Sequence, residues 1–331
     1  MFKKTLLTTT ALSVLVSSVA VAEIKVSGKQ EWEFGQLSKT GSSITDSPKT
    51  TASETVIAVT GGGDLGGGNS YAVAYEFANG DQDVVQANLN FGAFDIEIGQ
   101  NGSAGIEEVK ALLPFVNNRI QDIGGTSFGN NLTDNSSGQT YFAANMKAGD
   151  MGAVSIAYNP NEANGKTAAT DGGSGATSTG SSISGSFKGS LGVEGLTFGI
   201  GILKGSNAAT ANDDKAAESV GVTYNAGSFA VGYQRMKQTA NAAKSATVEN
   251  TIDLYGVSYK VADNLSVGVY KIDDTKSTEG SADVELSSTL VSVGYNLGAA
   301  KVSYDYIDAD NYNHTAGQGA TMHRVKIGMA F

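Results

Sequence analysis

The side chains best suited to chemistry in this 331-residue chain gather in one charged segment. Within residues 106–113, apolar side chains recur at helical spacing until Pro114 ends the pattern, which predicts a short helix with one apolar side. That side can pack on a wall while the acidic groups project into water. An ordinary solvated surface helix is the alternative interpretation. The charged residues of the segment are Glu107, Glu108, Lys110, Arg119 and Asp122.

Other candidate chemistry is weak. His314 and His323 have no metal-ligand spacing and there is no cysteine, so we expect no metal site, no cofactor and no histidine-dependent catalytic triad. The run Gly61–Gly66 matches G-x-G-x-x-G, but another strand follows it instead of the helix that a nucleotide site needs. The acidic pair Asp273 and Asp274 is interpreted as solvated charge in a loop. An enzyme would need a nucleophile, base and acid that converge on one face, and we find no histidine placed for this.

The first 22 residues have the pattern of a secretory signal peptide. Lys3 and Lys4 precede an apolar run over residues 11–21, and small residues suited to cleavage end the segment. The run is too short and too rich in serine and threonine for a membrane-spanning anchor, the alternative interpretation. We expect a signal peptide over residues 1–22 and a mature chain that begins at Glu23.

Composition narrows the class of protein. Removing residues 1–22 takes away two lysines and no acid, which leaves 20 basic and 33 acidic side chains and a formal charge of −13. Nucleic acid is therefore not expected as a partner. No later stretch approaches the roughly 20 apolar residues of a transmembrane helix. A transmembrane β-barrel stays open, because its strands alternate between lipid-facing and lumen-facing residues and hydropathy averages out.

Alternating segments of about eight to twelve residues fill the rest of the chain, which predicts about sixteen strands. Short connections (148–150, 226–228 and 262–264) read as tight turns, and longer hydrophilic ones include 206–217, 239–249 and 274–283. The predicted strands cover residues 24–34, 54–62, 69–78, 83–92, 94–101, 139–147, 152–159, 181–189, 196–204, 218–226, 228–237, 250–261, 265–273, 284–297, 300–308 and 321–331.

The two faces of each predicted strand differ in a way that favours a barrel over a soluble sandwich. In residues 69–78 one face carries Tyr71, Val73, Tyr75 and Phe77, while the other is small or polar. A wide water-filled barrel needs no packed core, so its inner face can be small and polar while its outer face meets lipid. In residues 284–297 the same phase turns Val293 to lipid. It turns Ser292 to the lumen, where we expect arginine to be tolerated.

Three stretches of the chain resemble the general diffusion porins of Gram-negative bacteria. Glu23–Gly28 is similar to their first strand, Tyr255–Val267 to a strand-turn-strand unit, and Val325–Phe331 to a final strand ending in phenylalanine. The resemblance implies an all-β transmembrane antiparallel barrel over residues 23–331, exported to the cell outer membrane as a passive channel for small hydrophilic solutes and ions. In that family the third external loop narrows the pore, and the matching segment here is 102–138.

The resemblance also implies partners. Family members are trimers in outer-membrane lipid and lipopolysaccharide, and they present the terminal aromatic residue, here Phe331, to the barrel-assembly machinery. A substrate-specific outer-membrane channel is the nearest alternative. A secreted adhesin or β-solenoid is a more distant one, because we find no fixed short repeat.

The phase of the outer strands predicts which charges line the pore. If Phe331 faces lipid, Arg324 and Lys326 face the lumen, and the first strand turns its own charged residues the same way. An acidic loop opposite a basic wall patch of Lys25, Lys29, Arg324 and Lys326 would create a field across the pore, with weak cation selectivity overall. The complete set of predicted wall residues is Lys25, Lys29, Glu31, Glu33, Lys301, Asp305, Arg324 and Lys326.

Overall fold

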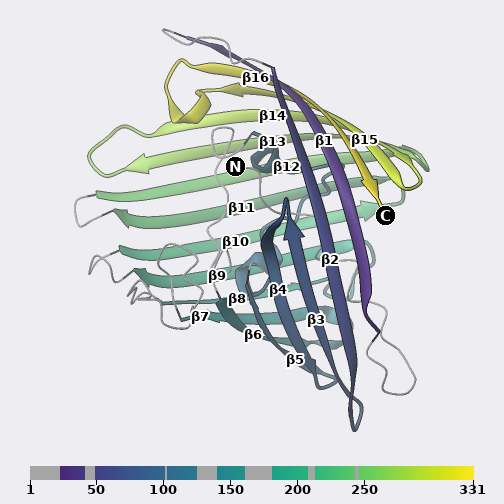
Figure 1. Ribbon diagram of the computed structural model, residues 1–331. Helices are drawn as coiled ribbons and strands as arrows, with labels where there is room; N and C mark the ends of the chain where they lie inside the picture. The colour runs from purple at the N-terminus through teal and green to yellow at the C-terminus, as the bar shows by residue number, and fades with distance from the viewer. Residues whose placement is uncertain are drawn as a thin grey trace.

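The computed structural model describes residues 23–41, 49–100, 103–124, 140–160, 181–207, 213–242 and 246–331. The predicted signal peptide, 1–22, lies outside these ranges, as does the end of the predicted loop segment, 125–138. Within the described ranges, sixteen antiparallel strands form one closed barrel in which sequence neighbours pair and β1 closes on β16 (Figure 1). No helix in these ranges is long and apolar enough to cross a membrane.

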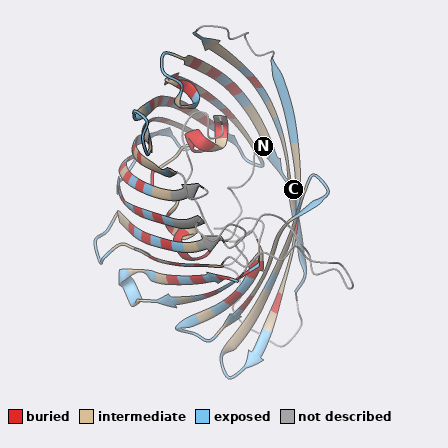
Figure 2. Cartoon of the chain, turned by 90° about the vertical axis from the view of Figure 1, so that its left-hand side faces the viewer, coloured by how far each residue is buried: buried red, intermediate tan, exposed pale blue. Residues whose placement is uncertain are grey.

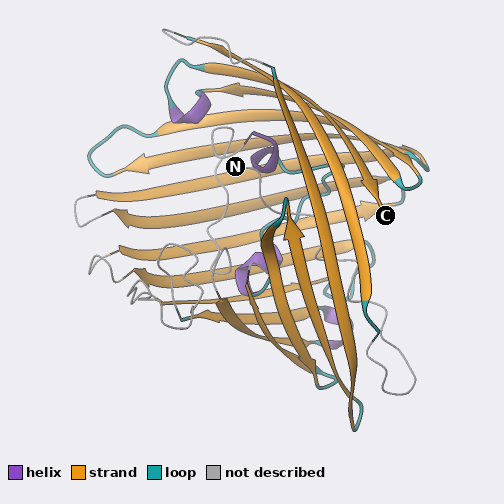
Figure 3. Cartoon of the chain, viewed as in Figure 1, coloured by secondary structure: helices purple, strands orange, loops and turns teal. Residues whose placement is uncertain are grey.

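Four short helical turns interrupt the strands in the described chain, and none of them belongs to the barrel wall (Figure 3). They are η1 (Gly105–Val109), α1 (Ile120–Gly124), η3 (Gly149–Met151) and η4 (Tyr312–His314). The strands are β1 (Lys25–Thr40), β2 (Thr50–Gly66), β3 (Asn69–Ala78), β4 (Asp81–Asn90), β5 (Phe94–Gln100), β6 (Thr140–Lys147), β7 (Ala153–Asn159), β8 (Ser181–Gly189), β9 (Leu196–Asn207), β10 (Asp213–Ala226), β11 (Phe229–Ala242), β12 (Ala246–Ala262), β13 (Leu265–Thr278), β14 (Val284–Leu297), β15 (Ala300–Asp310) and β16 (Gly319–Ala330).

Burial alternates residue by residue along the strands, as Figure 2 shows in its striped ribbons. Large apolar side chains at the predicted outward positions are exposed, such as Phe34, Val73 and Ile202 at 50%, 47% and 58%. Their neighbours on the inward face are buried or half-buried. The predicted phase is therefore confirmed, and the exposed apolar band is the surface that a lipid-embedded barrel presents.

The barrel closes where the last residue meets the first strand. Gly28 and Phe331 exchange two backbone hydrogen bonds of 2.9 Å, which extends the pairing of β1 with β16 by one residue pair. The Phe331 ring covers Gly28, because a Cβ atom on that glycine would lie 2.6 Å from ring atom Cε2. Glycine at 28 thus makes room for the terminal aromatic ring on the outer face.

Several strands extend further than the sequence predicts. Strands β9 to β13 extend into the predicted connections 206–217, 239–249 and 274–283, where residues 206–207, 213–217, 239–242, 246–249 and 274–278 are strand. Many of these residues are polar, but they continue the hairpin register, as in the pair Thr239 and Glu249. The apolar alternation marks only the part of each strand that faces lipid, whereas backbone pairing continues beyond it.

The inward position Ser292 does not face open water, which corrects the expectation that arginine fits there. Its side chain is fully buried and its hydroxyl donates a hydrogen bond of 2.6 Å to Asp305 Oδ1. An arginine would break this contact and has no space. The exposed inward residue on the same strand is Asn296.

We expect Val293→Arg to impair assembly, because the cation would face hydrocarbon at a cost of about 2 to 4 kcal/mol near the midplane. Asn296→Arg, an equal change on the inward face of β14, should leave assembly intact. Heat-modifiable folded protein on unheated gels measures both. Equal folded yields would show that the outward face of β14 does not meet lipid.

Candidate pore constriction

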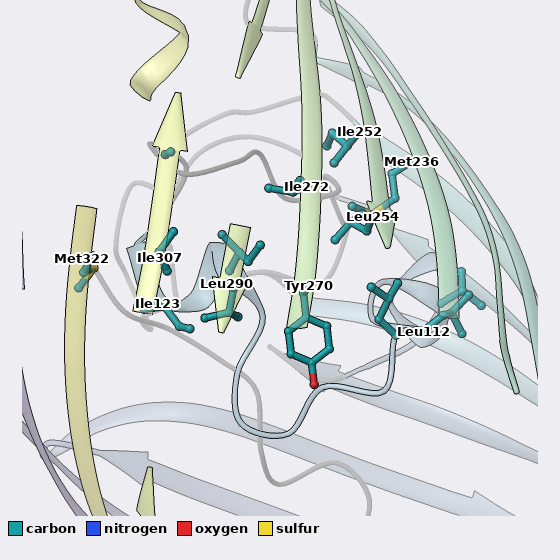
Figure 4. Close-up of a cluster of buried hydrophobic side chains, with 14 of the residues drawn as sticks. Leu112, Ile123, Met236, Ile252, Leu254, Tyr270, Ile272, Leu290, Ile307 and Met322 are labelled. Atoms are coloured by element: carbon teal, nitrogen blue, oxygen red, sulfur yellow. The ribbon is translucent and has the colours of Figure 1, made fainter. Parts of the chain in front are cut away.

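The described part of the long loop, residues 103–124, packs against the inward side of the barrel wall. Its apolar side chains join one buried cluster with inward-facing residues from β9 to β16 (Figure 4). The short helix η1 itself contacts β7, β8, β9 and β10. From the loop the cluster takes Ile106, Val109, Leu112, Leu113, Ile120 and Ile123, and from the wall it includes Leu203, Met236, Ile252, Leu254, Tyr270, Ile272, Leu290, Ile307 and Met322.

Glycines on the wall make space for the loop. A Cβ atom on Gly201 would lie 2.6 Å from Val109 Cγ2 and 3.0 Å from Ile106 Cγ1. A Cβ on Gly199 would lie 2.7 Å from a methyl of Leu112, so any larger residue would push the loop away from the wall. The small residues of the wall under η1 therefore let the apolar side of the loop pack closely against the sheet.

Buried side chains of the wall bind the loop backbone. Ser155 Oγ accepts from the Gly105 amide at 2.8 Å. The side-chain amide of Gln234 accepts a hydrogen bond from the Leu112 N–H at 3.0 Å and donates one to the Val109 carbonyl at 2.7 Å. These bonds satisfy backbone groups that would otherwise be buried without partners.

Further along, Tyr270 holds the turn of the loop. Its hydroxyl donates to the Pro114 carbonyl at 2.8 Å and accepts from the Val116 amide at 2.7 Å. Lys301 Nζ donates to the Val116 carbonyl at 3.0 Å. The path of the loop is thus fixed by packing and by hydrogen bonds together.

Asp305, which the sequence assigns to the pore wall, also holds the loop. Its carboxylate accepts from Asn117 Nδ2 at 3.0 Å and from Arg324 Nη2 at 2.8 Å, and both Asp305 and Arg324 are essentially fully buried. Together with Lys301, these wall charges support the loop instead of standing free in the lumen.

The charged residues of the loop are partly paired with one another. Lys110 Nζ lies 2.9 Å from Glu107 Oε1, and Arg119 lies 2.7 Å from Asp122 in a pair that is nearly buried. Burial raises the pKa of the Glu108 carboxyl above its ordinary value, Lys188 lowers it again in part, and Asp95 raises it further. Glu107 and Glu108 therefore lie together on η1, whereas Arg119 and Asp122 neutralise each other further along.

The wall formed by β1, β2, β15 and β16 carries interleaved charges of both signs. Lys29 lies 3.0 Å from Glu31 and 3.4 Å from Glu54, and Lys326 also lies 3.0 Å from Glu31. Arg324 contacts Glu33 at 3.3 Å in addition to Asp305. Lys25 is exposed and pairs with Glu23 at 3.5 Å. The structure brings the predicted cations together, but each has an acidic partner, so this surface is a mixed network.

Some residues that build the interior were not singled out in the sequence. Glu97 on β5 is buried and accepts a hydrogen bond from the Tyr141 hydroxyl. Gln234 and Tyr270 bind the loop backbone from β11 and β13. The alternation of apolar and polar residues predicts that these side chains face inward. Nothing in the sequence shows which of the inward-facing residues the loop covers.

Asp274 is corrected from a solvated loop acid to a buried one. It lies on β13, fully buried, and its Oδ1 lies 3.4 Å from Nε2 of His314 in η4. His314 also contacts the Asp274 carbonyl at 3.1 Å. The connection between β15 and β16 is thereby fastened to β13, and the side chain of Tyr312 joins the interior cluster.

A closed barrel with an exposed apolar band and a loop packed against its inner wall defines the class of outer-membrane channel proteins. The chain belongs to the Gram-negative porin family, whose model matches residues 8–331. It is accordingly an outer-membrane porin, a channel for the diffusion of small hydrophilic solutes. The closed barrel excludes the β-solenoid alternative.

Solved structures with the same fold share little sequence with it. OmpT of Vibrio cholerae, in a form lacking loop L8, is 14% identical with a TM-score of 0.68, over 94% of this chain and 99% of that one. An anion-selective porin from Comamonas acidovorans is 13% identical with a TM-score of 0.67, over 94% and 100%. OmpF of Salmonella typhi, in complex with daunomycin, is 14% identical with a TM-score of 0.67, over 94% and 98%. No curated protein sequence matches the chain.

We expect Gly201→Val to lift η1 from the wall into the lumen and so to lower single-channel conductance in KCl. The strain of overpacking should also destabilise the barrel by about 1 to 3 kcal/mol. Gly185→Val is the matched control, because a Cβ there would meet only the Ser155 carbonyl oxygen at 3.8 Å. Planar-bilayer recording and heat-modifiability gels measure the two effects. Parent-like conductance and stability in Gly201→Val would mean that η1 does not rest on this glycine.

Proposed function

We propose that this porin is a homotrimeric passive channel with weak cation selectivity, that residues 102–138 form its constriction loop, and that it has no enzymatic activity. The porin family and fold support a channel in place of an enzyme. The structure of OmpT described as a trimer form, 12% identical with a TM-score of 0.67, supports the trimer by analogy.

The placement of Glu107 and Glu108 on η1 carries the proposed selectivity. Asp95 acts electrostatically on Glu108, so the carboxylates of the loop and of β5 lie within one region of the interior. The cations of the opposite wall are paired with Glu31, Glu33 and Glu54. An acidic region facing a compensated wall favours cations, and the preference stays modest because salt screens charges over about 8 Å at physiological ionic strength.

Selectivity is not transferred from the structural relatives. The similar porin from Comamonas acidovorans is anion-selective, so the fold accommodates the opposite preference. The sign in this chain must come from its own interior charges. Its formal charge of −11 before any cleavage also favours cations near the mouths.

Export and assembly complete the proposal. Residues 1–22 would direct export and be cleaved, and Phe331 would be read by the barrel-assembly machinery. The pairing of Phe331 with Gly28 supports a role for this residue in closing the barrel as well. Lipopolysaccharide would contact exposed polar side chains of the strands, such as those of Arg235 and Lys271.

We expect Glu107→Gln with Glu108→Gln to shift the zero-current potential toward anions in a dilute KCl gradient. The change removes two negative charges from the interior and leaves Lys110 without its carboxylate partner. A matched control is Asp150→Asn with Glu194→Gln, which removes two exposed carboxylates at short turns. If the interior variant keeps the parent's zero-current potential, Glu107 and Glu108 do not control ion passage.

Cation preference should also depend on pH. Because burial raises the pKa of Glu108, this carboxyl takes up its proton at a higher pH than an ordinary glutamate as the solution is acidified. Selectivity should therefore begin to fall above the ordinary glutamate range of about 4.3, and Glu108→Gln should remove this early part of the titration. Zero-current potentials recorded from pH 8 to pH 4 test this. A titration unchanged by Glu108→Gln would assign the pH dependence to other groups.

A further inference from the structure

The inner wall formed by β4, β5 and β6 carries a cluster of oxygen atoms. Asp95 and Glu97 project inward from β5. Asn88 on β4 stands opposite Glu97 in the strand register, and Asn145 on β6 stands opposite Asp95. The four side chains therefore share one face over three adjacent strands, below the loop carboxylate of Glu108, which interacts electrostatically with both Asp95 and Glu97.

Hydrogen bonds inside the cluster leave some of its oxygens without partners. Asn145 Nδ2 donates to Asp95 Oδ2 at 2.9 Å and reaches Glu97 Oε2 at 3.5 Å, and Tyr141 donates to the other oxygen of Glu97. Oδ1 of Asn145 and Oδ1 of Asn88 are both buried and have no hydrogen-bond partner among the described residues. Asn88 is only 7% exposed. A buried acceptor of this kind is unfavourable unless a donor reaches it.

The chemistry of the cluster favours a ligand that is positively charged and donates several hydrogen bonds. Three carboxylates meet here, and Lys188 is the cation that acts on Glu108. Among the described residues, no three histidine, cysteine or acidic side chains are arranged to hold a metal ion. A primary ammonium group carries one positive charge and three donors and has no acceptor, which matches one carboxylate and two amide oxygens.

We propose that Asn88, Asp95 and Asn145 form a subsite for the primary ammonium group of a permeating solute. The inference rests on the proposed channel function and names a class of solute that the channel retains in passage. Asp95 supplies the opposite charge, and the two amide oxygens accept from the remaining N–H groups. Glu97 is held beside the site by hydrogen bonds from Tyr141 and Asn145.

Two cations of similar size and equal charge separate hydrogen bonding from charge alone. n-Propylammonium has three N–H donors, whereas tetramethylammonium has none. Reduction of the potassium current through single channels in a planar bilayer measures the binding of each. In the parent, n-propylammonium should block at about tenfold lower concentration, because hydrogen bonds to a charged group are among the stronger ones.

Asn88→Leu with Asn145→Leu keeps the branched shape and the number of side-chain heavy atoms but removes both acceptors, and should bring the two blocking concentrations within about twofold. Asn296→Leu, at the exposed inward asparagine of β14, should keep the tenfold difference. If the double variant yields no heat-modifiable barrel, Asp95→Asn carries the test, since it keeps the shape and should weaken the block by n-propylammonium.

The outcomes separate the two proposals. A parent that conducts potassium but is blocked equally by both cations overturns the subsite and leaves the channel in place. A persistent difference in the double variant, or in Asp95→Asn where that variant is used, also overturns it. A folded parent without potassium conductance would overturn the proposed channel function itself.

Discussion

Everything in this structure depends on pairing every backbone N–H and C=O of a sheet that lies in lipid. Hydrocarbon offers no hydrogen-bond partners, so a sheet that crosses it must have no free edge. Closure of β1 on β16 removes the edge, and the exchange of two bonds between Gly28 and Phe331 extends this seam to the last residue. Alternation then decides the chemistry of each side, because the pleat sends neighbouring residues to lipid and to the interior.

Closure of the barrel creates an interior that the strand side chains alone do not fill. The loop packs against one side of this interior. Inward positions under the loop combine glycine with large apolar residues, as in Ile252, Leu254 and Gly256 on β12. The large residues pack with the loop, and the glycines let it approach the sheet closely. Where the loop rests, the wall thus carries apolar side chains on its inner as well as its outer face, and this packing, together with the bonds from Gln234 and Tyr270, gives the loop one position.

The sequence predicts the barrel well because its signal is local. The predicted segments 69–78, 181–189 and 284–297 coincide with β3, β8 and β14, since alternation and turn residues act over a few neighbours. The outer ends of β10 to β13 were missed, because polar residues there pair without an apolar face. Burial of Ser292 and Asp274 was missed for another reason. Alternation tells which face a side chain takes, but coverage by the loop or by η4 is a contact between distant residues.

Contacts between distant residues also explain why the charged wall residues do not form the basic patch that the alternation of the strands predicts. Lys29, Arg324 and Lys326 do face inward, but cross-strand neighbours of opposite sign face the same way, and at a few ångströms each pair cancels most of its field in the lumen. Arg324 and Asp305 are buried as well, so their separation would leave a charge without a partner. Their contribution is therefore to hold the loop and the seam in place. In the proposed channel, a passing ion would sense the charge left over after this pairing, which includes the carboxylates on η1 and on β5.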